Sequence, residues 1–412
     1  MDITSFKNIH FFEIFQKDNT ERNIGYSLFN NVILVGRNYY YPNVLLYSEN
    51  KLISPYDEKI MSLNKDSFYD DNKYVLIHEN KYIKNINDPI FFLIYNFDNY
   101  YHFLYDTLPY LFTYLELKKN IPNLKILINY PNKNMNNLYK FNNELLEKII
   151  DMNDLIIHSE NNIYKEIYVS TSLTHGGFSN NNPRPEIFKI YKIISDNIDY
   201  KKISDNIKNK HIDKIYISRR TWINNDKSNI GTDYTSRRKM MNEDNLVKEL
   251  EKQNFTEIFS ENLNTDEKIY LFSNANIIIG SIGGGMANLL FSNSNTKSIV
   301  FVTPYFLDIN YRFKFSMEHT NIIYFNDVKT YLEDNKIPLY SRVIINNKYG
   351  EICEYNKDNN KYLINISNND VAGFNNLINF DNDWFEECNF KTLDNGLNSP
   401  YIININKLLE FL

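Results

Sequence analysis

Residues 276–302 read NIIIGSIGGGMANLLFSNSNTKSIVFV, and this stretch decides the fold of the region around it. The apolar run at 276–280 predicts a buried strand, and a glycine-rich loop follows it. Residues 285–292 predict a helix, and 298–302 predict a second buried strand. A strand, a helix and a second strand in this order predict a parallel unit of an α/β sheet.

The loop within this stretch concentrates glycine, since four of the twelve glycines of the chain lie between positions 280 and 285. Gly283, Gly284 and Gly285 remove Cβ atoms where backbone approaches a ligand closely, and the amides up to Met286 can bind an anion. A tight turn without a ligand is the alternative. The loop is neither a P-loop, because it lacks the Lys-Ser/Thr ending, nor a GxGxxG motif.

The same alternation of strands and helices continues outward from this stretch. The elements expected before it are strands at 213–218 and 255–260 and helices at 242–253 and 265–275. They predict a nucleotide-binding α/β domain over residues 206–334. Hairpin-like runs then predict a small β-rich or mixed extension over 335–412.

Residues 1–205 predict another α/β domain. The expected strands lie at 32–36, 43–47, 74–78, 91–95, 124–130, 154–159 and 166–172, and the expected helices at 102–118, 141–152 and 183–198. Strands that alternate with helices predict a parallel sheet covered on both faces. The fold class is therefore expected to be α/β, with two such domains.

The composition is that of a globular protein and excludes some partners. The 412 residues are 43% hydrophobic and 23% charged with a formal net charge of -6, so no overall positive field attracts nucleic acid or an anionic membrane. Two cysteines are too few for a disulfide framework or a zinc cluster. The start resembles no secretory signal and no run of about 18 apolar residues occurs, so we expect no membrane span and a cytoplasmic location.

Two arginine pairs lie near the glycine loop in the expected sheet. Arg219 and Arg220 end the strand at 213–218, and Arg237 and Arg238 precede the helix that begins at 242. Guanidinium groups at the carboxyl ends of parallel strands suit a diphosphate, and a solvated basic loop is the alternative.

A further candidate site lies in NYYHFLYDTLPYLF at 99–112. His102 and Asp106 are four residues apart, so on a helix they share one face and the carboxylate can orient the imidazole as a general base. A surface ion pair is the alternative. His175, on a later loop, and Arg312, after the strand at 298–302, are additional candidates.

Asp381 and Asp383 form a D-x-D pattern, by which many sugar-nucleotide enzymes hold a divalent metal. The pattern lies in the C-terminal tail, before an apparent helical turn. We therefore expect an N-cap there rather than a metal site.

Taken together, these motifs resemble glycosyltransferase family 61, whose members carry the segments N-x-x-H-F-x-x-D-x-L-P, I-S-R-R, R-R-x-x-x-N-E-D and G-x-H-G-A-G-x-x-N in this order. The resemblance covers roughly residues 30–330. The matching residues are Asn99, His102, Asp106, Leu108, Pro109, Ile217 to Arg220, Arg237, Arg238, Asn242 to Asp244, Gly280, Gly283, Gly285 and Asn288.

The resemblance implies a GT-B fold, in which two Rossmann-like domains face each other and the second one holds the donor. It implies an inverting transfer of N-acetylglucosamine or a pentose such as xylose from a UDP-sugar to a hydroxyl of a glycan or protein, without a metal or other cofactor. His102 or Asp106 is then the base. The residues expected to bind or order the donor are Arg219, Arg220, Arg237, Arg238, Glu243, Ser281, Gly283, Gly284, Gly285, Met286 and Asn288.

One position departs from the family pattern, because Ile282 stands where the family has histidine. Ser281 or His175 would then supply a polar contact in its place. The departure leaves open a second hypothesis, a catalytically silent protein that binds a sugar nucleotide or a glycan on the same fold. A metal-dependent GT-A enzyme using Asp381 and Asp383 is a third hypothesis, and the order of elements disfavours it.

Overall fold

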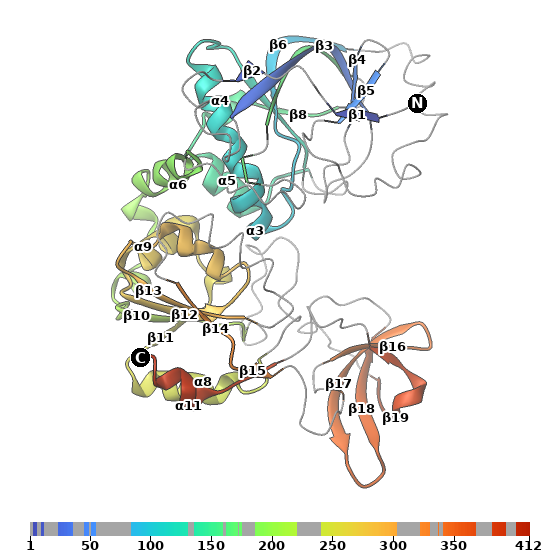
Figure 1. Ribbon diagram of the computed structural model, residues 1–412, viewed down its shortest axis with the longest axis vertical. Helices are drawn as coiled ribbons and strands as arrows, with labels where there is room; N and C mark the ends of the chain where they lie inside the picture. The colour runs from blue at the N-terminus through green and yellow to red at the C-terminus, as the bar shows by residue number, and fades with distance from the viewer. Residues whose placement is uncertain are drawn as a thin grey trace. The chain divides into compact units, whose positions relative to one another are not determined.

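The computed structural model describes residues 3–5, 10–11, 24–35, 45–48, 51–54, 84–130, 136–159, 162–171, 173–174, 186–220, 240–302, 322–329, 337, 341–367, 381–392 and 401–412. The chain forms two compact units and passes from the first to the second between Asp199 and Tyr200 (Figure 1). The sequence places this boundary between 205 and 206. Each unit is built on its own sheet.

The first unit contains a mixed sheet of nine strands, in the order β1-β5-β4-β3-β9-β6-β7-β8 with β2 paired to β3. The strands are β1 (Ile3–Ser5), β2 (His10–Phe11), β3 (Gly25–Val35), β4 (Leu45–Ser48), β5 (Lys51–Ser54), β6 (Lys84–Phe92), β7 (Lys125–Ile128), β8 (Leu155–Ile157) and β9 (Asn162–Ser170). Strands β9, β6, β7 and β8 are parallel to one another, whereas β3 is antiparallel to β9 and β4.

The prediction of a wholly parallel sheet in this unit is therefore wrong for β3, β4 and β5, which form antiparallel pairs. The connections that lead from β3 through β4 to β5 are shorter than the dozen or more residues that a parallel crossover needs. The strand expected at 74–78 lies outside the described residues.

The helices of the first unit include one run that changes type along its length. They are α3 (Tyr100–His102), the π-helix η2 (Phe103–Thr107), the 3-10 helices η3 (Leu108–Tyr110) and η4 (Met152–Asp154), α4 (Leu111–Lys118), α5 (Lys140–Leu146) and α6 (Ile187–Asp196). The single helix expected over 102–118 is thus divided. Pro109 contributes to the division, because it has no N–H to donate to the carbonyl of Tyr105 in a regular α-helix.

The second unit contains a sheet of five parallel strands, in the order β11-β10-β12-β13-β14. The strands are β10 (Lys214–Ile217), β11 (Thr256–Ile258), β12 (Ile277–Ser281), β13 (Lys297–Phe301) and β14 (Ile322–Phe325). The helices along these strands are η5 (Tyr200–Lys202), α7 (Asp205–Lys208), α8 (Glu243–Lys252), η7 (Ser260–Asn262), α9 (Thr265–Asn274) and η8 (Met286–Phe291). No helix among the described residues of either unit is long and apolar enough to cross a membrane.

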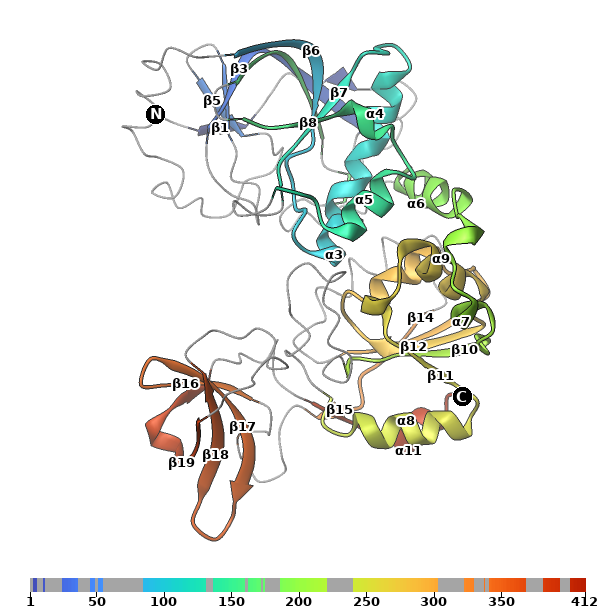
Figure 2. The ribbon, with the colours of Figure 1, turned by 180° about the vertical axis from the view of Figure 1, so that it is seen from behind.

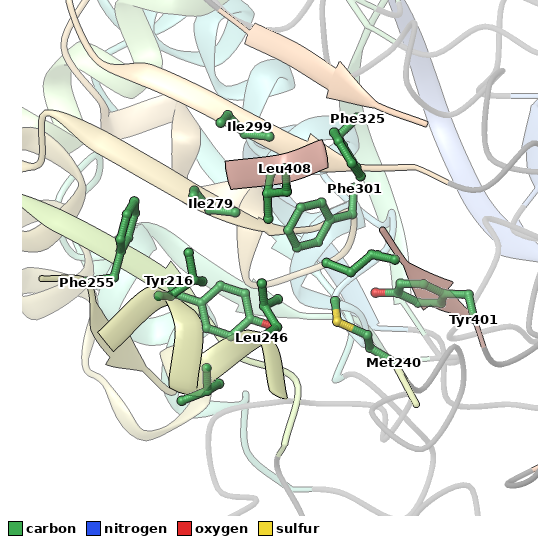
Figure 3. Close-up of a cluster of buried hydrophobic side chains, with 13 residues drawn as sticks. Tyr216, Met240, Leu246, Phe255, Ile279, Ile299, Phe301, Phe325, Tyr401 and Leu408 are labelled. Atoms are coloured by element: carbon green, nitrogen blue, oxygen red, sulfur yellow. The ribbon is translucent and has the colours of Figure 1, made fainter. Parts of the chain in front are cut away.

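The strand, loop, helix and strand expected over 276–302 are present, and the helix η8 is a short 3-10 helix. Three glycines precede it, and glycine has a low helix propensity. Helix α8 covers one face of the sheet together with the C-terminal helix α11 (Ile405–Leu409), and α9 covers the other face (Figures 1 and 2). Figure 3 shows the buried core on the α8 side, which includes Tyr216, Leu246, Ile279, Ile299, Phe301 and Leu408.

The chain leaves this sheet and later returns to it. Strand β15 (Val328–Lys329), which follows β14, pairs in antiparallel fashion with β21 (Ile402–Ile403) near the C-terminus. Tyr401, Ile403 and Leu408 are buried in the core of the second sheet. The sequence groups these residues with the extension at 335–412, whereas in the structure they pack against the parallel sheet of the second unit.

Between β15 and β21 the chain builds an antiparallel sheet of its own, in the order β19-β18-β17-β16-β20. Its elements are β16 (Arg342–Ile345), β17 (Lys348–Asn356), β18 (Lys361–Ser367), β19 (Asp381–Glu386), the 3-10 helix η11 (Glu387–Asn389) and β20 (Lys391–Thr392). Residues Val343, Ile352, Tyr362 and Ile364 form part of its separate core.

The D-x-D pattern lies in β19, so the prediction of an N-cap at Asp381 and Asp383 is wrong. These residues pair with Ile366 and Ile364 of β18. Pairing with a neighbouring strand satisfies their backbone groups, and it overrides the local preference of Asp and Asn for an N-cap.

A buried carboxylate ties α4 to β7 in the first unit. Asp154 accepts hydrogen bonds from the hydroxyl of Tyr114 at 2.8 Å, from Nζ of Lys118 at 2.7 Å and from Nζ of Lys125 at 2.9 Å. Burial alone would raise the pKa of Asp154, but these three hydrogen bonds outweigh it and lower the pKa to about 2.

This network makes the first prediction. We expect Asp154→Asn to reduce the free energy of unfolding at pH 7 by about 2 kcal/mol, which is the energy that corresponds to lowering the pKa of Asp154 from its ordinary value to about 2. Because the folded-state pKa is depressed, this stability is present above about pH 4 and is lost as the pH falls towards 2. Urea unfolding of the variant and the wild type at several pH values measures both effects.

The control is Asp196→Asn, which removes the 58% exposed partner of Lys192 on α6 and should change stability little. Two variants with equal stability losses at pH 7 would contradict the role given to Asp154.

Candidate active site

The carboxyl ends of β10 and β12 lie side by side where the strand order of the second sheet reverses. From β10 the chain moves to β11 on one side, and it then crosses back to β12 on the other side. Ligands of open α/β sheets bind at such a point, beyond the carboxyl ends of the strands. Arg219 and Arg220 follow β10, and the glycine loop at 282–285 follows β12. The structure therefore brings these two predicted groups to one edge.

The glycine loop lies directly against the end of β10. A Cβ atom on Gly283 would lie 2.7 Å from Nη1 of Arg219, and Gly283 also has a φ of +155°, which residues with a side chain rarely adopt. A Cβ atom on Gly285 would lie 2.8 Å from Cγ2 of Ile217 and from Oγ of Ser260. Glycine at both positions thus permits the close approach of the loop to its neighbours.

Two of the residues expected to bind the donor are packed inward. Met286 and Asn288 are fully buried. The Met286 side chain packs against Gly280, where a Cβ atom would lie 2.6 Å from its Sδ. Nδ2 of Asn288 donates to the carbonyl of Gly285 at 2.9 Å. These two side chains pack beneath the loop, while the three glycines at 283–285 are only half-buried.

Ser281 and Ile282 connect β12 to the loop, and both are buried, with 6% and 4% exposure. The Ser281 hydroxyl forms a hydrogen bond with the hydroxyl of Tyr401. The N–H of Ile282 donates to the carbonyl of Phe301 at 3.1 Å, so the loop begins as a continuation of the sheet.

Arg219 and Arg220 have different surroundings. The guanidinium of Arg220 donates to Glu257 at 2.6 and 2.9 Å and to Asp244 at 2.7 Å. The hydrogen bonds to Glu257, above all, raise the pKa of Arg220. Arg220 thus links β10 to β11 and α8, whereas Arg219 lies against Gly283 of the loop.

Glu243, the first residue of α8, is a buried anchor for the end of β10. Glu243 is only 2% exposed. Oε1 accepts hydrogen bonds from the hydroxyl of Tyr216 at 2.7 Å, the hydroxyl of Ser218 at 3.1 Å and the backbone N–H of Arg219 at 2.8 Å. Burial raises the pKa of Glu243, and these hydrogen bonds oppose the rise. The carboxylate therefore orders the backbone from which Arg219 projects.

Glu261 in η7 is a residue that the sequence analysis missed. It is 8% exposed, and its Oε1 is buried without a hydrogen-bond partner among the described residues. Burial raises the pKa of Glu261, while the charges of Lys268 and Arg219 lower it. A signal was available, because Glu261 directly follows the strand expected at 255–260 and so belongs to the same carboxyl edge.

In the first unit, His102 and Asp106 form a hydrogen-bonded pair, with Nδ1 of His102 2.5 Å from Oδ2 of Asp106. Asp106 is 6% exposed and His102 is half-buried. Asn99 caps α3 by accepting a hydrogen bond from the N–H of His102 at 3.2 Å. Because an ionised carboxylate only accepts hydrogen bonds, Nδ1 of His102 carries the proton in this pair.

The π-helix η2 that carries Asp106 is held by two neighbouring segments. The hydroxyl of Tyr191 in α6 donates to the carbonyl of Leu104 at 2.9 Å, and the hydroxyl of Thr107 donates to the carbonyl of Asn96 at 2.8 Å. Single π-helical turns inside α-helices are frequent at functional sites. These bonds fix the turn that places Asp106 opposite His102.

Four predicted site residues, Arg237, Arg238, His175 and Arg312, lie outside the described residues. Asp383, of the D-x-D pattern, is exposed in β19. Within the described ranges, no group of three or more His, Cys, Asp or Glu side chains is arranged to hold a metal ion.

In a comparison with protein families, residues 100–299 match the model described as Glycosyltransferase 61. No curated protein matches the chain. The match includes the His102 pair, the end of β10, Glu243 and the glycine loop. It confirms the family that the ordered motifs suggested and supports a glycosyltransferase, with a sugar donor and a glycan acceptor.

The Glu243 anchor makes the second prediction. Glu243→Ala leaves the three donors on Oε1 without their acceptor, so we expect a loss of roughly 3 kcal/mol or more in unfolding free energy. Glu243→Gln keeps a side-chain oxygen acceptor, and we expect a loss of less than about half of that. Because burial raises the pKa of Glu243, the wild type loses some stability as the pH rises above about 4.5, and the Gln variant should lack this part of the slope.

Denaturant unfolding at several pH values measures both effects. The control is Glu249→Ala, on the same helix and 38% exposed, which should change stability little. An Ala variant no less stable than the Gln variant would overturn the role of Glu243 as an acceptor.

Proposed function

Since residues 100–299 are a glycosyltransferase family 61 region, we propose that the protein is an inverting glycosyltransferase that uses a UDP-sugar and needs no metal. The proposed donor sugar is N-acetylglucosamine or a pentose such as xylose, and the acceptor is a hydroxyl of a glycan or protein. The proposed fold is of the GT-B type, with the donor on the second unit and the base on the first. The observation that carries the proposal is the contact between Arg219 and the glycine loop at the point of strand reversal.

The proposed donor site stabilises the negative charge of the leaving UDP. Arg219 supplies a guanidinium group, which pairs well with phosphate oxygens, and the backbone at Gly283 to Gly285 supplies fixed N–H dipoles. Glu243 orders Arg219 through its backbone N–H. These groups take the place of a divalent cation, so transfer should be insensitive to EDTA.

The proposed base is His102, oriented by Asp106. Nε2 of His102 removes the proton of the acceptor hydroxyl while the hydroxyl oxygen attacks the anomeric carbon of the sugar. The bond between that carbon and the diphosphate oxygen breaks as the new glycosidic bond forms. A single displacement of this kind inverts the configuration at the anomeric carbon.

A second candidate function is binding without catalysis, and Ile282 favours it. An apolar, buried side chain occupies the position of the family histidine, so no imidazole is available there to contact the donor. Transfer assays with a panel of UDP-sugars and trial acceptors separate the two functions, because a silent protein binds UDP or a glycan and turns over no donor.

The third prediction concerns the donor. Arg219→Ala should weaken UDP binding by roughly 10- to 150-fold, which corresponds to about 1.5 to 3 kcal/mol for hydrogen bonds to a charged group. Isothermal titration calorimetry with UDP measures the change. The control is Lys252→Ala, which removes an equal charge at the far end of α8 and should leave the affinity unchanged. Equal affinities for the Arg219 variant and the control would refute the assignment.

The fourth prediction concerns the base. His102→Ala and Asp106→Asn should lower turnover by about 10²- to 10⁴-fold, because each removes or misorients the group that accepts the proton. UDP affinity should stay within about twofold, because both residues belong to the first unit. Initial rates of transfer and calorimetry measure the two quantities. His211→Ala, at an exposed histidine, is the control, and a loss of UDP affinity that parallels the loss of rate would point to a folding role instead.

A further inference from the structure

The side chain of Tyr401 reaches the start of the glycine loop from near the C-terminus. Its hydroxyl forms a hydrogen bond with the hydroxyl of Ser281, the last residue of β12. Both residues are buried, with exposures of 3% and 6%. The two hydroxyls are therefore partners in an environment that offers little water.

The backbone around Tyr401 also holds the other side of the donor site. The carbonyl of Tyr401 accepts a hydrogen bond from the N–H of Met241 at 2.8 Å. The side-chain amide of Asn242 clamps Ile403, donating to its carbonyl at 2.8 Å and accepting from its N–H at 3.2 Å. Met241 and Asn242 directly precede Glu243, the anchor of the β10 end.

One short segment, residues 401–403, thus contacts both elements that shape the edge at β10 and β12. It bonds to Ser281 before the loop, and it pairs with the residues before Glu243. Figure 3 shows Tyr401 beside Met240 within the core of this unit. The segment lies outside residues 100–299, the range that matches the family.

We infer that Tyr401 is a positioning residue for the donor loop and acts through Ser281. The inference rests on the proposed function, because it concerns the affinity of the same loop for a nucleotide diphosphate. The sequence predicts that Ser281 contacts the donor, but in the structure its hydroxyl forms a hydrogen bond with the hydroxyl of Tyr401.

The physical reason lies in the glycines that follow Ser281. A loop with glycine at 283, 284 and 285 loses much conformational entropy when it becomes ordered. If the start of the loop is already held in place, less conformational entropy is lost when a ligand binds. The hydrogen bond therefore strengthens binding although it does not contact the ligand. Loss of the Tyr401 hydroxyl would leave the Ser281 hydroxyl buried without this partner, and the start of the loop would shift or open.

The test is a double-mutant cycle. Tyr401→Phe keeps the ring in the core and removes only the hydroxyl, and Ser281→Ala removes the other partner. Each should weaken UDP binding about three- to tenfold, as one net hydrogen bond does. The double variant should be no weaker than the stronger single variant, because both changes remove the same bond. Additive losses would overturn the action through Ser281.

A second measurement does not need a ligand. Hydrogen exchange of the amides at 282–286 in the ligand-free protein should become faster in Tyr401→Phe. The control, Leu408→Val, loosens the packing of the same C-terminal segment, and it should speed exchange in α11 with little change at 282–286 and little change in UDP affinity. Unchanged loop exchange in Tyr401→Phe, or equal effects in the control, would overturn the inference.

These measurements separate the inference from the proposed function. A wild-type protein that binds no UDP contradicts the proposed function, and loop exchange in the variants still decides the role of Tyr401. A wild-type protein that binds UDP with the same affinity as Tyr401→Phe contradicts the inference alone. In transfer assays, the variant should raise KM for the donor several-fold and leave kcat within about twofold, because the hydroxyl touches no reacting atom.

Discussion

The carboxylate of Glu243 joins the end of a strand to the start of a helix, and the candidate site of the second unit depends on that junction. One oxygen accepts three hydrogen bonds from β10 and the residue that follows it. Such a group is costly to bury, and it is stable only because its donors are fixed in place. Those donors fix the direction in which Arg219 leaves the sheet, and Arg219 in turn lies so close to position 283 of the loop that only glycine fits there. The loop sequence and the buried acid are parts of one arrangement.

In the first unit, an irregular helical backbone positions the candidate residues His102 and Asp106. The helical run changes from α to π to 3-10, and two hydroxyl groups hold it. Tyr191 donates to the carbonyl of Leu104 within the run, and Thr107 of the run donates to the carbonyl of Asn96 before it. The irregular turn costs regular helical hydrogen bonds, and the surrounding side chains supply others. The turn holds the carboxylate of Asp106 against Nδ1 of His102, and this contact sets the orientation of the imidazole ring. In both units, polar groups with fixed partners set the orientation of one half-buried side chain, His102 in the first and Arg219 in the second.

The sequence predicts those features that depend on local pattern. Strand β12, the glycine loop and strand β13 follow from apolar periodicity and glycine content, and the pairing of His102 with Asp106 follows from a spacing of four. The antiparallel strands of the first sheet and the strand at Asp381 were not predicted, because pairing between strands overrides local preference there. The division of the helix was also not predicted, although Pro109 is a local signal for it. Glu261 could have been found by asking which residues follow each parallel strand. Tyr401 could not, because no periodicity links it to Ser281, 120 residues earlier.

The pairing of β15 with β21 has a consequence for how the protein is made and how it can vary. The pairing of β15 with β21 holds the two ends of the small antiparallel sheet next to each other. The small sheet has its own core, so it is an insertion into the fold of the second unit. Insertions with adjacent ends are exchanged or lengthened with little effect on their host. During synthesis, however, the host core stays incomplete until Leu408 has left the ribosome, although β10 to β14 emerged long before. The apolar face beneath α11 is therefore exposed while the whole insertion is translated.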